Sequence, residues 1–138
     1  WGFSAWQAVD AAKAVARKRG VEAEVWDLRT LVPYDRDAIL EAARRTGRVL
    51  IAQSDRTFAG FGRQLQGDLI ESVPGCLVRV VGQLDIPAVG QSRVLEDAIT
   101  LQVGDIEQAI GELAETSPRA WLDNDLHWLS HAPLRSLT

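Results

Sequence analysis

The chain has 138 residues, 46% of them apolar and 25% charged, and a net charge of −4. This length and composition predict one globular domain with its own hydrophobic core. The basic residues are scattered, and no apolar run approaches the ~18 residues of a membrane span, which argues against nucleic-acid and membrane partners. The single cysteine, Cys76, excludes an internal disulfide framework and is compatible with a reducing, cytoplasmic location. The chain has no methionine and starts at Trp1, so we expect a fragment or a trimmed chain.

Residues 4–19 are expected to form an amphipathic helix, because their apolar side chains recur at the helical period. Ser4 is the expected N-cap, and Gly20 stands where a glycine commonly ends a helix. One stripe of this helix carries Trp6, Val9, Ala12 and Ala16, and another carries Gln7, Asp10, Lys13 and Arg17. The first stripe is the predicted apolar face.

Residues 21–35 are predicted to organise the domain. Apolar and polar positions alternate over residues 21–26, which is the period of a β-strand. The chain leaves this strand at Asp27, and Pro33 prevents further sheet pairing because it lacks an N–H group. Asp35 is the expected N-cap of a helix over residues 35–46. Ligands and partner domains meet an open α/β sheet where its strands end, so this turn is a candidate contact site.

Two more strands are expected downstream. Residues 48–53 form a nearly continuous apolar run, typical of a central parallel strand covered on both faces, and residues 76–81 form the next strand. A loop over residues 54–62 and a helix over residues 63–73 connect them. Residues 83–101 are predicted to be mostly irregular, with a short strand or turn around residues 98–101.

The alternation of helices and strands predicts an α/β protein, a three-layer α/β/α sandwich with parallel pairing and right-handed crossovers. A last helix is expected to begin at the cap residue Asp105 and to run to about residue 115, with Gln108 completing a capping box. We expect this domain to occupy residues 1–118. Residues 119–138 are rich in tryptophan and leucine without a clear period, so we expect them to pack on this domain or on a neighbouring chain.

Two glycines and one arginine are the strongest local candidates for a binding site. The turn Gly60-Phe61-Gly62 lies between a strand and a helix, where backbone N–H groups can hold a phosphate. The dinucleotide fingerprint needs a third glycine where Leu65 stands, so a tight turn is the preferred interpretation. Arg79 interrupts an apolar strand, and two interpretations stay open: it pairs with a carboxylate or reaches water, or it is aimed at a ligand anion or a partner domain.

Histidines and acids near the end of the chain have a spacing that can suit a metal. His127 and His131 are four residues apart, with Asp123 and Asp125 nearby. No strong third ligand accompanies them, and Pro133 argues against a long helix, so surface or interface histidines are the preferred interpretation.

No catalytic, cofactor-binding or metal-binding residue is assigned from the sequence. Cys76 has no histidine close in sequence, and a free cysteine is commonly a small buried apolar residue. Asp27, Asp85 and Glu96 are each explained as turn or cap residues, and no Ser/His/Asp order or carboxylate pair stands out.

A set of short motifs follows in a fixed order along residues 1–115. They are EVWDLRTLVPYD at residues 24–35, TGR at 46–48, GFG at 60–62, RVVG at 79–82, DIP at 85–87 and LE at 95–96. Together they resemble the C-terminal domain of the transketolase family, and most closely the β subunit of the thiamine-dependent E1 component of 2-oxoacid dehydrogenases. The motif residues, which are also the candidate interface residues, are Asp27, Arg29, Pro33, Asp35, Gly60, Gly62, Arg79, Asp85, Pro87 and Glu96.

The resemblance implies a sheet of about five strands, mostly parallel with one antiparallel, and places the family's first strand directly before Trp1. It implies that thiamine diphosphate and Mg are held by two other domains, the diphosphate-binding and pyrimidine-binding domains, and that this domain holds no cofactor. Those two domains and further subunits of a homo- or hetero-oligomer are the expected partners, with an E2 acyltransferase as a further one.

Some residues depart from the family pattern. Gln53 and Gln64 stand where the family usually has glutamate, and AVG at residues 88–90 replaces a Pro-Tyr-Ala run. The expected function is that of a non-catalytic domain that supports subunit assembly in the oxidative decarboxylation of a 2-oxo acid. Two alternatives stay open: a domain of a transketolase-like enzyme that transfers two-carbon units, and a stand-alone regulatory module that binds a small anion through the Gly60–Gly62 turn with Arg79 or Arg56.

Overall fold

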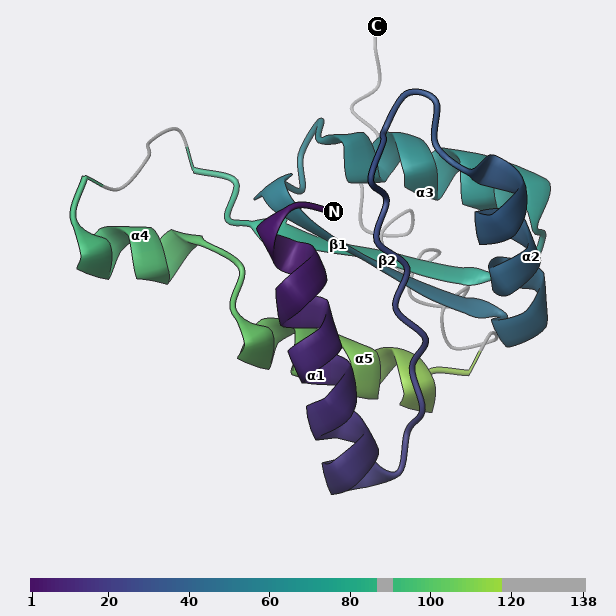
Figure 1. The fold of residues 1–138 in the computed structure, drawn as a ribbon, viewed down its shortest axis with the longest axis horizontal. Helices are drawn as coiled ribbons and strands as arrows, with labels where there is room; N and C mark the ends of the chain where they lie inside the picture. Colours follow the sequence, from purple (N-terminus) through teal and green to yellow (C-terminus); the bar gives the residue numbers. More distant parts are fainter. Residues whose placement is uncertain (87–90, 118–138) are drawn as a thin grey trace, which may run out of the picture.

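A computed structural model describes residues 1–86 and 91–117 (Figure 1). The elements along the chain are α1 (Phe3–Arg19), α2 (Arg36–Thr46), β1 (Arg48–Arg56), α3 (Phe61–Ser72), β2 (Leu77–Gln83), α4 (Arg93–Ile99) and α5 (Val103–Glu115). The tryptophan-rich segment 119–138, with its two histidines, and Pro87 lie outside the described residues, as does the AVG run at residues 88–90.

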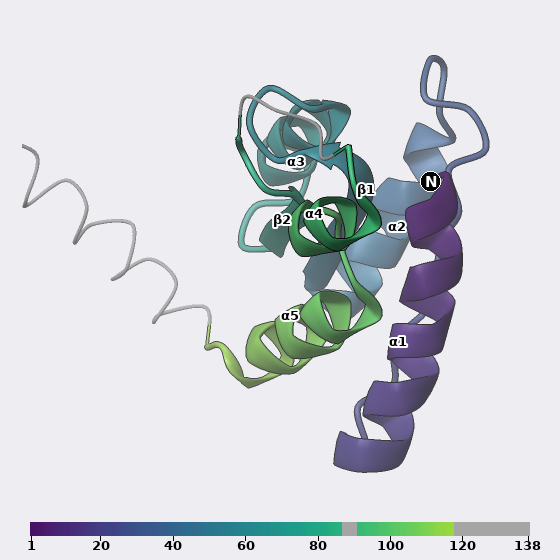
Figure 2. The same cartoon turned by 90° about the vertical axis from the view of Figure 1, so that its left-hand side faces the viewer.

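The two strands pair in parallel at the centre of an α/β fold, with Arg48 opposite Leu77 and Ala52 opposite Val81. Figure 2 shows α3 on one side of these strands and α5 on the other. One apolar cluster joins α2 and α3 to the strands, and its buried residues include Ile39, Leu40, Ala43, Ile51, Leu65, Leu69, Val78 and Val80. A second cluster on the opposite face joins α1 and α5 to the strands, with Ala11, Leu101 and Ile106 buried and Leu50, Ala52 and Val81 packed against them. Helices therefore cover both faces of the parallel pair, as the alternating pattern predicted.

The predicted ends of the helices hold at several positions. Gly20 and Gly47 end α1 and α2 in the left-handed region, each with φ 65°. Asp35 is confirmed as the N-cap of α2, because its carboxylate accepts a hydrogen bond from the Ala38 N–H at 3.3 Å. This bond satisfies one of the N–H groups that a first helical turn leaves free.

Helix α1 turns a different face to the core from the predicted one. Its buried residues are Ser4, Gln7, Ala11, Ala12, Ala14 and Val15. Trp6, which was assigned to the apolar face, is 75% exposed, whereas Gln7 is buried and donates its side-chain amide to the Leu101 carbonyl at 2.7 Å. Helix α1 packs on α5, and small alanine side chains allow a close approach between two helices. The helix begins before Ser4, with Gly2 as its N-cap.

The strand predicted over residues 21–26 does not form. These residues belong to no strand, and among the described residues the sheet consists of β1 and β2 alone. In Figure 1 the segment between α1 and α2 crosses in front of the two strands at a steep angle. A strand needs a neighbour that runs alongside it at about 4.8 Å, and this segment has none, so its alternating pattern has no ladder to join.

Residues 93–99 form helix α4, where the sequence pattern predicted mostly irregular structure. The Ser92 side chain accepts a hydrogen bond from the Leu95 N–H at 3.4 Å and caps this helix. None of its residues is buried, although Val94, Leu95 and Ile99 are apolar. No strand occurs around residues 98–101: the helix ends at Ile99, and an extended residue, Thr100, follows it.

Helix α5 begins earlier than predicted. Its N-cap is Gln102 rather than Asp105, and the Asp105 carboxylate reaches back from the first turn to accept the Gln102 N–H at 2.9 Å. Gln108, predicted to complete the capping box, instead donates to Glu112 at 2.7 Å. Asp105 is thus the third helical residue of the capping box, and Gln102 is the N-cap.

Candidate functional site

The carboxyl ends of β1 and β2 are joined through Asp85. Its carboxylate accepts hydrogen bonds from the Thr57 hydroxyl at 2.7 Å and from the Phe58 N–H at 2.9 Å. These two bonds lower the pKa of the Asp85 carboxyl, the Thr57 bond being the larger cause. Arg63, near the start of α3, also binds this loop by donating to the Thr57 carbonyl at 3.1 Å. The loop after β1 is therefore fixed to the residues that follow β2 and to α3.

Gln53 lies inside this corner and is completely buried. Its Oε1 accepts the Gly62 N–H at 2.7 Å, and its Nε2 donates to the Arg56 carbonyl at 2.5 Å. A Cβ added to Gly60 would lie 2.6 Å from Gln53 Nε2, and one added to Gly62 would lie 2.5 Å from Gln53 Oε1. A Cβ added to Gly82 of β2 would lie 3.0 Å from Gln53 Cγ and 2.3 Å from the Asp55 carbonyl oxygen. The three glycines thus leave room for the Gln53 side chain and for the backbone beside it.

The Gly60-Phe61-Gly62 turn therefore makes hydrogen bonds within the fold. Gly62 donates to Gln53, and Arg63 donates its N–H to the Gly60 carbonyl at 3.0 Å. Of the two interpretations of this turn, the arrangement matches the tight turn between strand and helix. An anion would have to displace the Gln53 side chain from the Gly62 N–H.

Phe61 brings together residues that are far apart in the sequence. Its ring makes edge-to-face contacts with Trp1, at a centroid distance of 5.6 Å, and with Tyr34, at 6.3 Å. Such pairs stabilise a fold by about 0.5–1.5 kcal/mol beyond the area that they bury. The turn after residues 21–26 and the turn before α3 are therefore packed on one another.

Tyr34 also belongs to a polar cluster with Asp68 and Arg36. The Tyr34 hydroxyl donates to Asp68, and the Arg36 guanidinium binds the same carboxylate through Nη2 at 2.7 Å and through Nε at 2.9 Å. Burial, followed by the hydrogen bond to Asp68, raises the pKa of Tyr34 to about 12. The hydrogen bonds from Arg36 and then from Tyr34 lower the pKa of the Asp68 carboxyl. This cluster joins the start of α2 to α3.

Arg79 pairs with Glu112 of α5 through its Nη1. The hydrogen bond from Arg79 lowers the pKa of the Glu112 carboxyl. Of the two interpretations left open for this arginine, the structure shows the pair with a carboxylate. It joins β2 to α5 across the face that carries the second apolar cluster.

The other motif residues lie apart from this corner. Asp27 and Arg29 are an exposed pair whose charged atoms are 3.9 Å apart, and Pro33 follows a cis peptide bond in the same turn. Glu96 is exposed on α4, and Asp35 caps α2 as described above. The structure therefore gathers Gly60, Gly62 and Asp85 at one corner and leaves the rest on separate surfaces.

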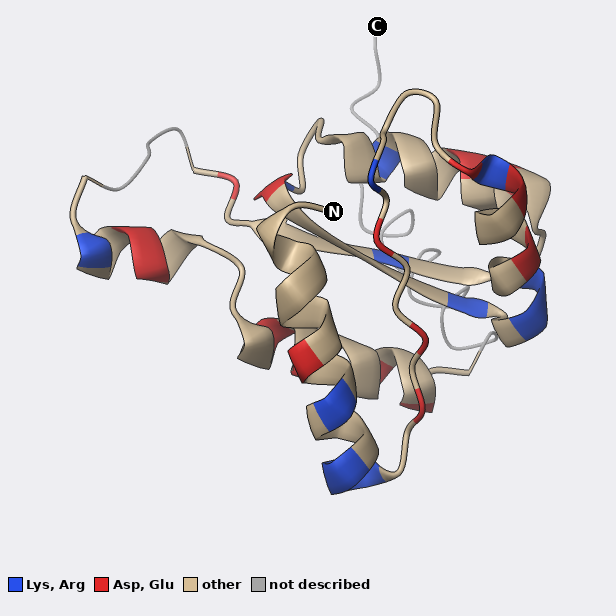
Figure 3. Cartoon of the chain, viewed as in Figure 1, with Lys and Arg blue, Asp and Glu red and all other residues tan. Residues whose placement is uncertain are grey.

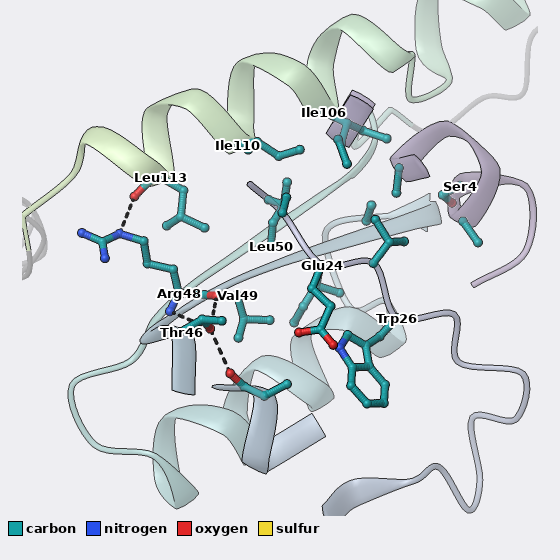
Figure 4. Close-up of a pocket in the computed structure, with 18 of the residues that line it drawn as sticks. Ser4, Glu24, Trp26, Thr46, Arg48, Val49, Leu50, Ile106, Ile110 and Leu113 are labelled. Carbon is teal, nitrogen blue, oxygen red and sulfur yellow. Dashed lines mark hydrogen bonds between the residues drawn. The ribbon is translucent and has the colours of Figure 1, made fainter. Parts of the chain in front are cut away.

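An apolar cavity of about 320 Å³ lies beside β1 (Figure 4). It is lined by residues 48–52 of β1, residues 21–26 and Leu28, Ala5, Ala8 and Ala12 of α1, and Ile106, Ile110 and Leu113 of α5. Arg48, the first residue of β1, also lines the cavity, and its Nε donates to the Leu113 carbonyl at 3.0 Å. The cavity therefore lies between residues 21–26 and β1.

Charged side chains gather mainly on the helices, as Figure 3 shows, with arginine and lysine on the last turns of α1. Lys18 pairs with Glu107 of α5 at 2.6 Å, and Arg19 lies 3.6 Å from Glu115. Basic residues at the end of a helix also interact favourably with its dipole. These residues are thus used within the fold.

A family model described as "Transketolase, C-terminal domain" matches residues 1–106 of the chain. This match covers both strands and every motif residue found in the sequence. The chain belongs to this family.

Individual relatives resemble this transketolase C-terminal domain over a part of their own length. The 2-oxoisovalerate dehydrogenase subunit beta of Bacillus subtilis is 33% identical over 102 residues, which are 71% of this chain and 31% of that protein. The 6-deoxy-6-sulfo-D-fructose transketolase subunit SqwH of Clostridium sp. is 31% identical over 114 residues, 83% of this chain and 35% of that protein. The chain thus spans about a third of the length of these two relatives.

A solved structure described as "Split gene transketolase, inactive beta4 tetramer" shares the fold with a TM-score of 0.72 and 29% identity. The match covers 81% of this chain and 36% of that one. The resemblance to E1 β subunits, predicted from the ordered motifs, is confirmed by the family match, by the 2-oxoisovalerate dehydrogenase β subunit, and by the pyruvate dehydrogenase E1 component subunit beta of Rickettsia bellii, which is 32% identical over 83 residues, 58% of this chain and 25% of that protein.

Sequence reasoning missed two residues, Gln53 inside this corner and Asp68 in the polar cluster with Tyr34 and Arg36. Gln53 was noted only as a departure from the family pattern, yet it is the side chain around which Gly60, Gly62 and Gly82 close. Asp68 was not singled out at all. An acid on the exposed side of a helix gives no local signal, because its partner Arg36 is 32 residues away.

The described residues offer little for metal or thiol chemistry. Residues 1–86 and 91–117 contain no group of three or more histidine, cysteine or acidic side chains placed to hold a metal ion. Burial raises the pKa of the Cys76 thiol, so this cysteine is held in its less reactive, protonated form. No helix within the same residues is long and apolar enough to cross a membrane.

Proposed function

We propose that this transketolase C-terminal domain is part of a thiamine-diphosphate-dependent 2-oxoacid dehydrogenase, in which it supports subunit assembly and carries no catalytic residue. The observation that carries the proposal is the 33% identity over 102 residues with a 2-oxoisovalerate dehydrogenase β subunit, together with the family match. The whole protein would then catalyse the oxidative decarboxylation of a 2-oxo acid in the cytoplasm.

The cofactor is proposed to bind elsewhere in the whole protein. The residues present do not fit a diphosphate and its Mg ion, because the Gly62 N–H is bonded to Gln53 and the Asp85 carboxylate is bonded to Thr57 and Phe58. Residues 1–86 and 91–117 contain no group of three or more histidine, cysteine or acidic side chains that could hold the Mg ion. We propose that thiamine diphosphate and Mg are held by the diphosphate-binding and pyrimidine-binding domains of the whole protein, which are the first proposed partners.

Assembly is proposed to use the corner at the carboxyl ends of the strands. Large apolar side chains are exposed there and on the adjoining α4: Phe58 (79%), Leu84 (56%), Val94 (79%) and Leu95 (57%). Exposed apolar groups of this size favour contact with another protein surface. Gly60, Gly62 and Asp85 lie at this corner. The other motif residues, namely Asp27, Arg29, Pro33, Arg79, Pro87 and Glu96, are proposed to support further contacts.

The full organisation of the domain is also part of the proposal. The domain extends over residues 1–118 and completes a sheet of about five strands, one of them antiparallel, in the whole protein. The apolar segment 119–138 packs on this domain or on a neighbouring chain. Further subunits of a homo- or hetero-oligomer and an E2 acyltransferase are the remaining proposed partners.

A transketolase-like enzyme is the second candidate. The SqwH transketolase subunit matches a larger share of this chain, 83%, than the dehydrogenase subunit does, and the structural neighbour is described as a transketolase. In that case the same domain would support an enzyme that transfers two-carbon units. The anion-binding module has no comparable support, since Arg79 is paired with Glu112.

The decisive experiment uses the full-length product of the natural gene with thiamine diphosphate and Mg. Branched and straight 2-oxo acids are offered with an artificial electron acceptor, and a ketose donor is offered with an aldose acceptor in parallel. We expect reduction of the electron acceptor, dependent on thiamine diphosphate. Two-carbon transfer without such reduction would favour the second candidate.

A companion measurement tests the non-catalytic role. Isothermal titration of thiamine diphosphate and Mg into the 138-residue chain is expected to give no heat of binding, whereas the full-length protein binds. Stoichiometric binding by the 138-residue chain would overturn the proposal.

A further inference from the structure

The loop after β1 exposes a large apolar side chain. Phe58 is 79% exposed, although an aromatic ring of this size is stabilised by leaving water. Apolar surface lies close by, since Leu84 is 56% exposed and directly precedes Asp85, to which the Phe58 N–H is bonded. Some feature of the fold must therefore hold the ring outward.

Two side chains fix the first half of this loop. Gln53 Nε2 donates to the Arg56 carbonyl at 2.5 Å, and Arg63 Nε donates to the Thr57 carbonyl at 3.1 Å. Gln53 belongs to β1 and Arg63 to α3, so both are parts of the packed domain. Neither of these bonds reaches the residue that carries the exposed ring.

Asp85 fixes the second half of the loop. Its Oδ2 accepts the Thr57 hydroxyl at 2.7 Å, and its Oδ1 accepts the Phe58 N–H at 2.9 Å. Asp85 is itself held in place, because the N–H of the preceding residue, Leu84, donates to the Ile99 carbonyl at 3.0 Å. One carboxylate after β2 thus sets the position of the Phe58 backbone.

The conformation of Ala59 shows that this part of the loop is constrained. Its φ is 58°, and in the part of the chain that the structure describes it is the one residue other than glycine with a positive φ. Such a residue is strained, and the strain persists only where the surroundings over-determine the backbone. The fixed points on either side are Phe58, bonded to Asp85, and Gly60, whose carbonyl accepts the Arg63 N–H at 3.0 Å. Without the bond to Asp85, Ala59 is free to return to a negative φ, and the Phe58 ring then moves with it.

We propose that Asp85 is a positioning residue, whose two hydrogen bonds hold the loop over residues 57–59 in one conformation and present the Phe58 ring to an apolar surface of a neighbouring subunit. The inference rests on the proposed function, since it takes this corner as the assembly surface. Asp85 acts through the backbone of the loop and does not contact the neighbouring subunit. Because the loop is already ordered, association loses less conformational entropy than it would with a mobile loop.

Hydrogen bonding, more than charge, gives Asp85 this role. The bonds from Thr57 and Phe58 lower the pKa of the Asp85 carboxyl more than the charges of Arg63 and Arg56 do. An asparagine has nearly the same shape: its Oδ1 can accept the Phe58 N–H, and its Nδ2 can donate to the Thr57 hydroxyl. An alanine can do neither. Asp85→Asn and Asp85→Ala therefore separate the hydrogen bonds from the charge of the side chain.

Association of the full-length protein is the first measurement. Sedimentation analysis compares the parent with Asp85→Ala, Asp85→Asn and the control Glu71→Ala, which removes the same charge from an exposed position on α3. We expect Asp85→Ala to weaken association about ten-fold although Phe58 is present, and the other two variants to change it by less than about two-fold. Circular dichroism confirms that each variant is folded.

A double-mutant cycle with Phe58→Ala separates positioning from direct contact. A residue that acts only through the Phe58 ring has no effect once the ring is gone, so Asp85→Ala should not weaken the association of the Phe58→Ala variant further. Equal weakening by Asp85→Ala with and without the ring would mean that Asp85 touches the neighbouring subunit itself, and the inference would be wrong.

Hydrogen exchange read by mass spectrometry reports the loop directly. The Phe58→Ala variant is the background, because its subunit contact is weakened and the loop is accessible. Adding Asp85→Ala should make the peptide over residues 57–62 exchange about ten-fold faster and leave the peptides of α2 unchanged. Equal exchange of the 57–62 peptide with and without Asp85→Ala would overturn the inference.

The outcomes also separate this inference from the proposed function. If Phe58→Ala weakens association and Asp85→Ala does not, the assembly surface stands and the role of Asp85 fails. If neither substitution changes association, the proposed assembly surface itself fails, and the inference fails with it.

Discussion

Both the oxygen and the nitrogen of the Gln53 side-chain amide make hydrogen bonds, so this position requires a side chain with both an acceptor and a donor. Its oxygen accepts the Gly62 N–H, and its nitrogen donates to the Arg56 carbonyl. A carboxylate has the same shape but no donor, and in a buried position its charge is costly.

Gln53→Glu is therefore expected to lower the free energy of unfolding by about 2–4 kcal/mol at pH 7. Burial raises the pKa of the new carboxyl above its value of about 4.3 in the unfolded chain. The variant is closest to the parent in stability below that pH, and the deficit grows as the pH rises through the raised pKa. Urea denaturation between pH 4 and pH 8 measures this.

Gln64→Glu is the matched control, because Gln64 is exposed on α3 and the change in charge is the same. We expect a small effect without this pH dependence. An equal loss of stability in the two variants would mean that the amide at position 53 is not what matters.

Tyr34 is the only tyrosine, so its ionisation can be followed without interference. Burial and Asp68 raise its pKa to about 12, and absorbance at the tyrosinate wavelength should rise near that pH. A raised pKa means that the stabilisation is fully present below the unfolded value of 10.0 and is lost as the pH rises through about 12. Asp68→Asn should move the titration toward lower pH. A midpoint at 10.0 in the parent would contradict the hydrogen-bonded cluster of Tyr34, Arg36 and Asp68.

Gly62 and Gly67, both in α3, allow a matched comparison of two glycine-to-alanine substitutions in one helix. A Cβ on Gly62 would lie 2.5 Å from Gln53 Oε1 and 2.9 Å from Val80 Cγ1, whereas one on Gly67 meets nothing within 4 Å. Gly62→Ala is expected to destabilise the chain by about 1–3 kcal/mol, and Gly67→Ala to stabilise it by about 0.5–1 kcal/mol. Thermal denaturation of both variants measures the difference. Equal effects would contradict the close packing of β1, β2 and α3 around Gln53.

Local chemistry was sufficient to predict the ends of α1 and α2 at Gly20 and Gly47, the start of α2 at Asp35, and the two strands. Gly20, Gly47 and Asp35 act through their own backbone or through the next few residues, and these effects are visible in sequence. The pattern of residues 48–53 and 76–81 likewise located β1 and β2, although both strands extend further toward their carboxyl ends.

Elements that depend on a distant partner were not predictable in this way. Residues 21–26 have the period of a strand, but pairing needs a neighbour, and the cavity separates them from β1. On α1 the aromatic Trp6 suggested the buried face, whereas close packing against α5 selected the alanines. The Gly60–Gly62 turn could be placed from sequence, but the reason for its glycines, the side chain of Gln53, could not.

At the scale of the whole molecule, a substitution of the exposed Phe58 tests subunit assembly separately from the stability of the domain. Its side chain is 79% exposed, so Phe58→Glu should leave the denaturation midpoint of the 138-residue chain unchanged. In the full-length protein we expect subunit association to weaken by about ten-fold or more, as for an aromatic contact residue. Sedimentation analysis measures the association.

Ile70→Glu is the control, because Ile70 is also an exposed apolar residue, at 51%, but lies on α3 away from the strand ends. It should leave the association unchanged. Equal weakening by both variants would place the contact surface elsewhere.

Helix α4 stands away from the rest of the fold in Figure 1, with no buried residue and with Arg93 at its start 93% exposed. Trypsin should therefore cut after Arg93 before it reaches the covered parts of the molecule. Helix α5 lies on the far side of that cut, yet it is held to α1 and to both strands by the second apolar cluster. The nicked protein should then elute as a single species in buffer and yield two fragments only in denaturant. The chain could therefore be divided within α4 and reassembled from two separately expressed fragments.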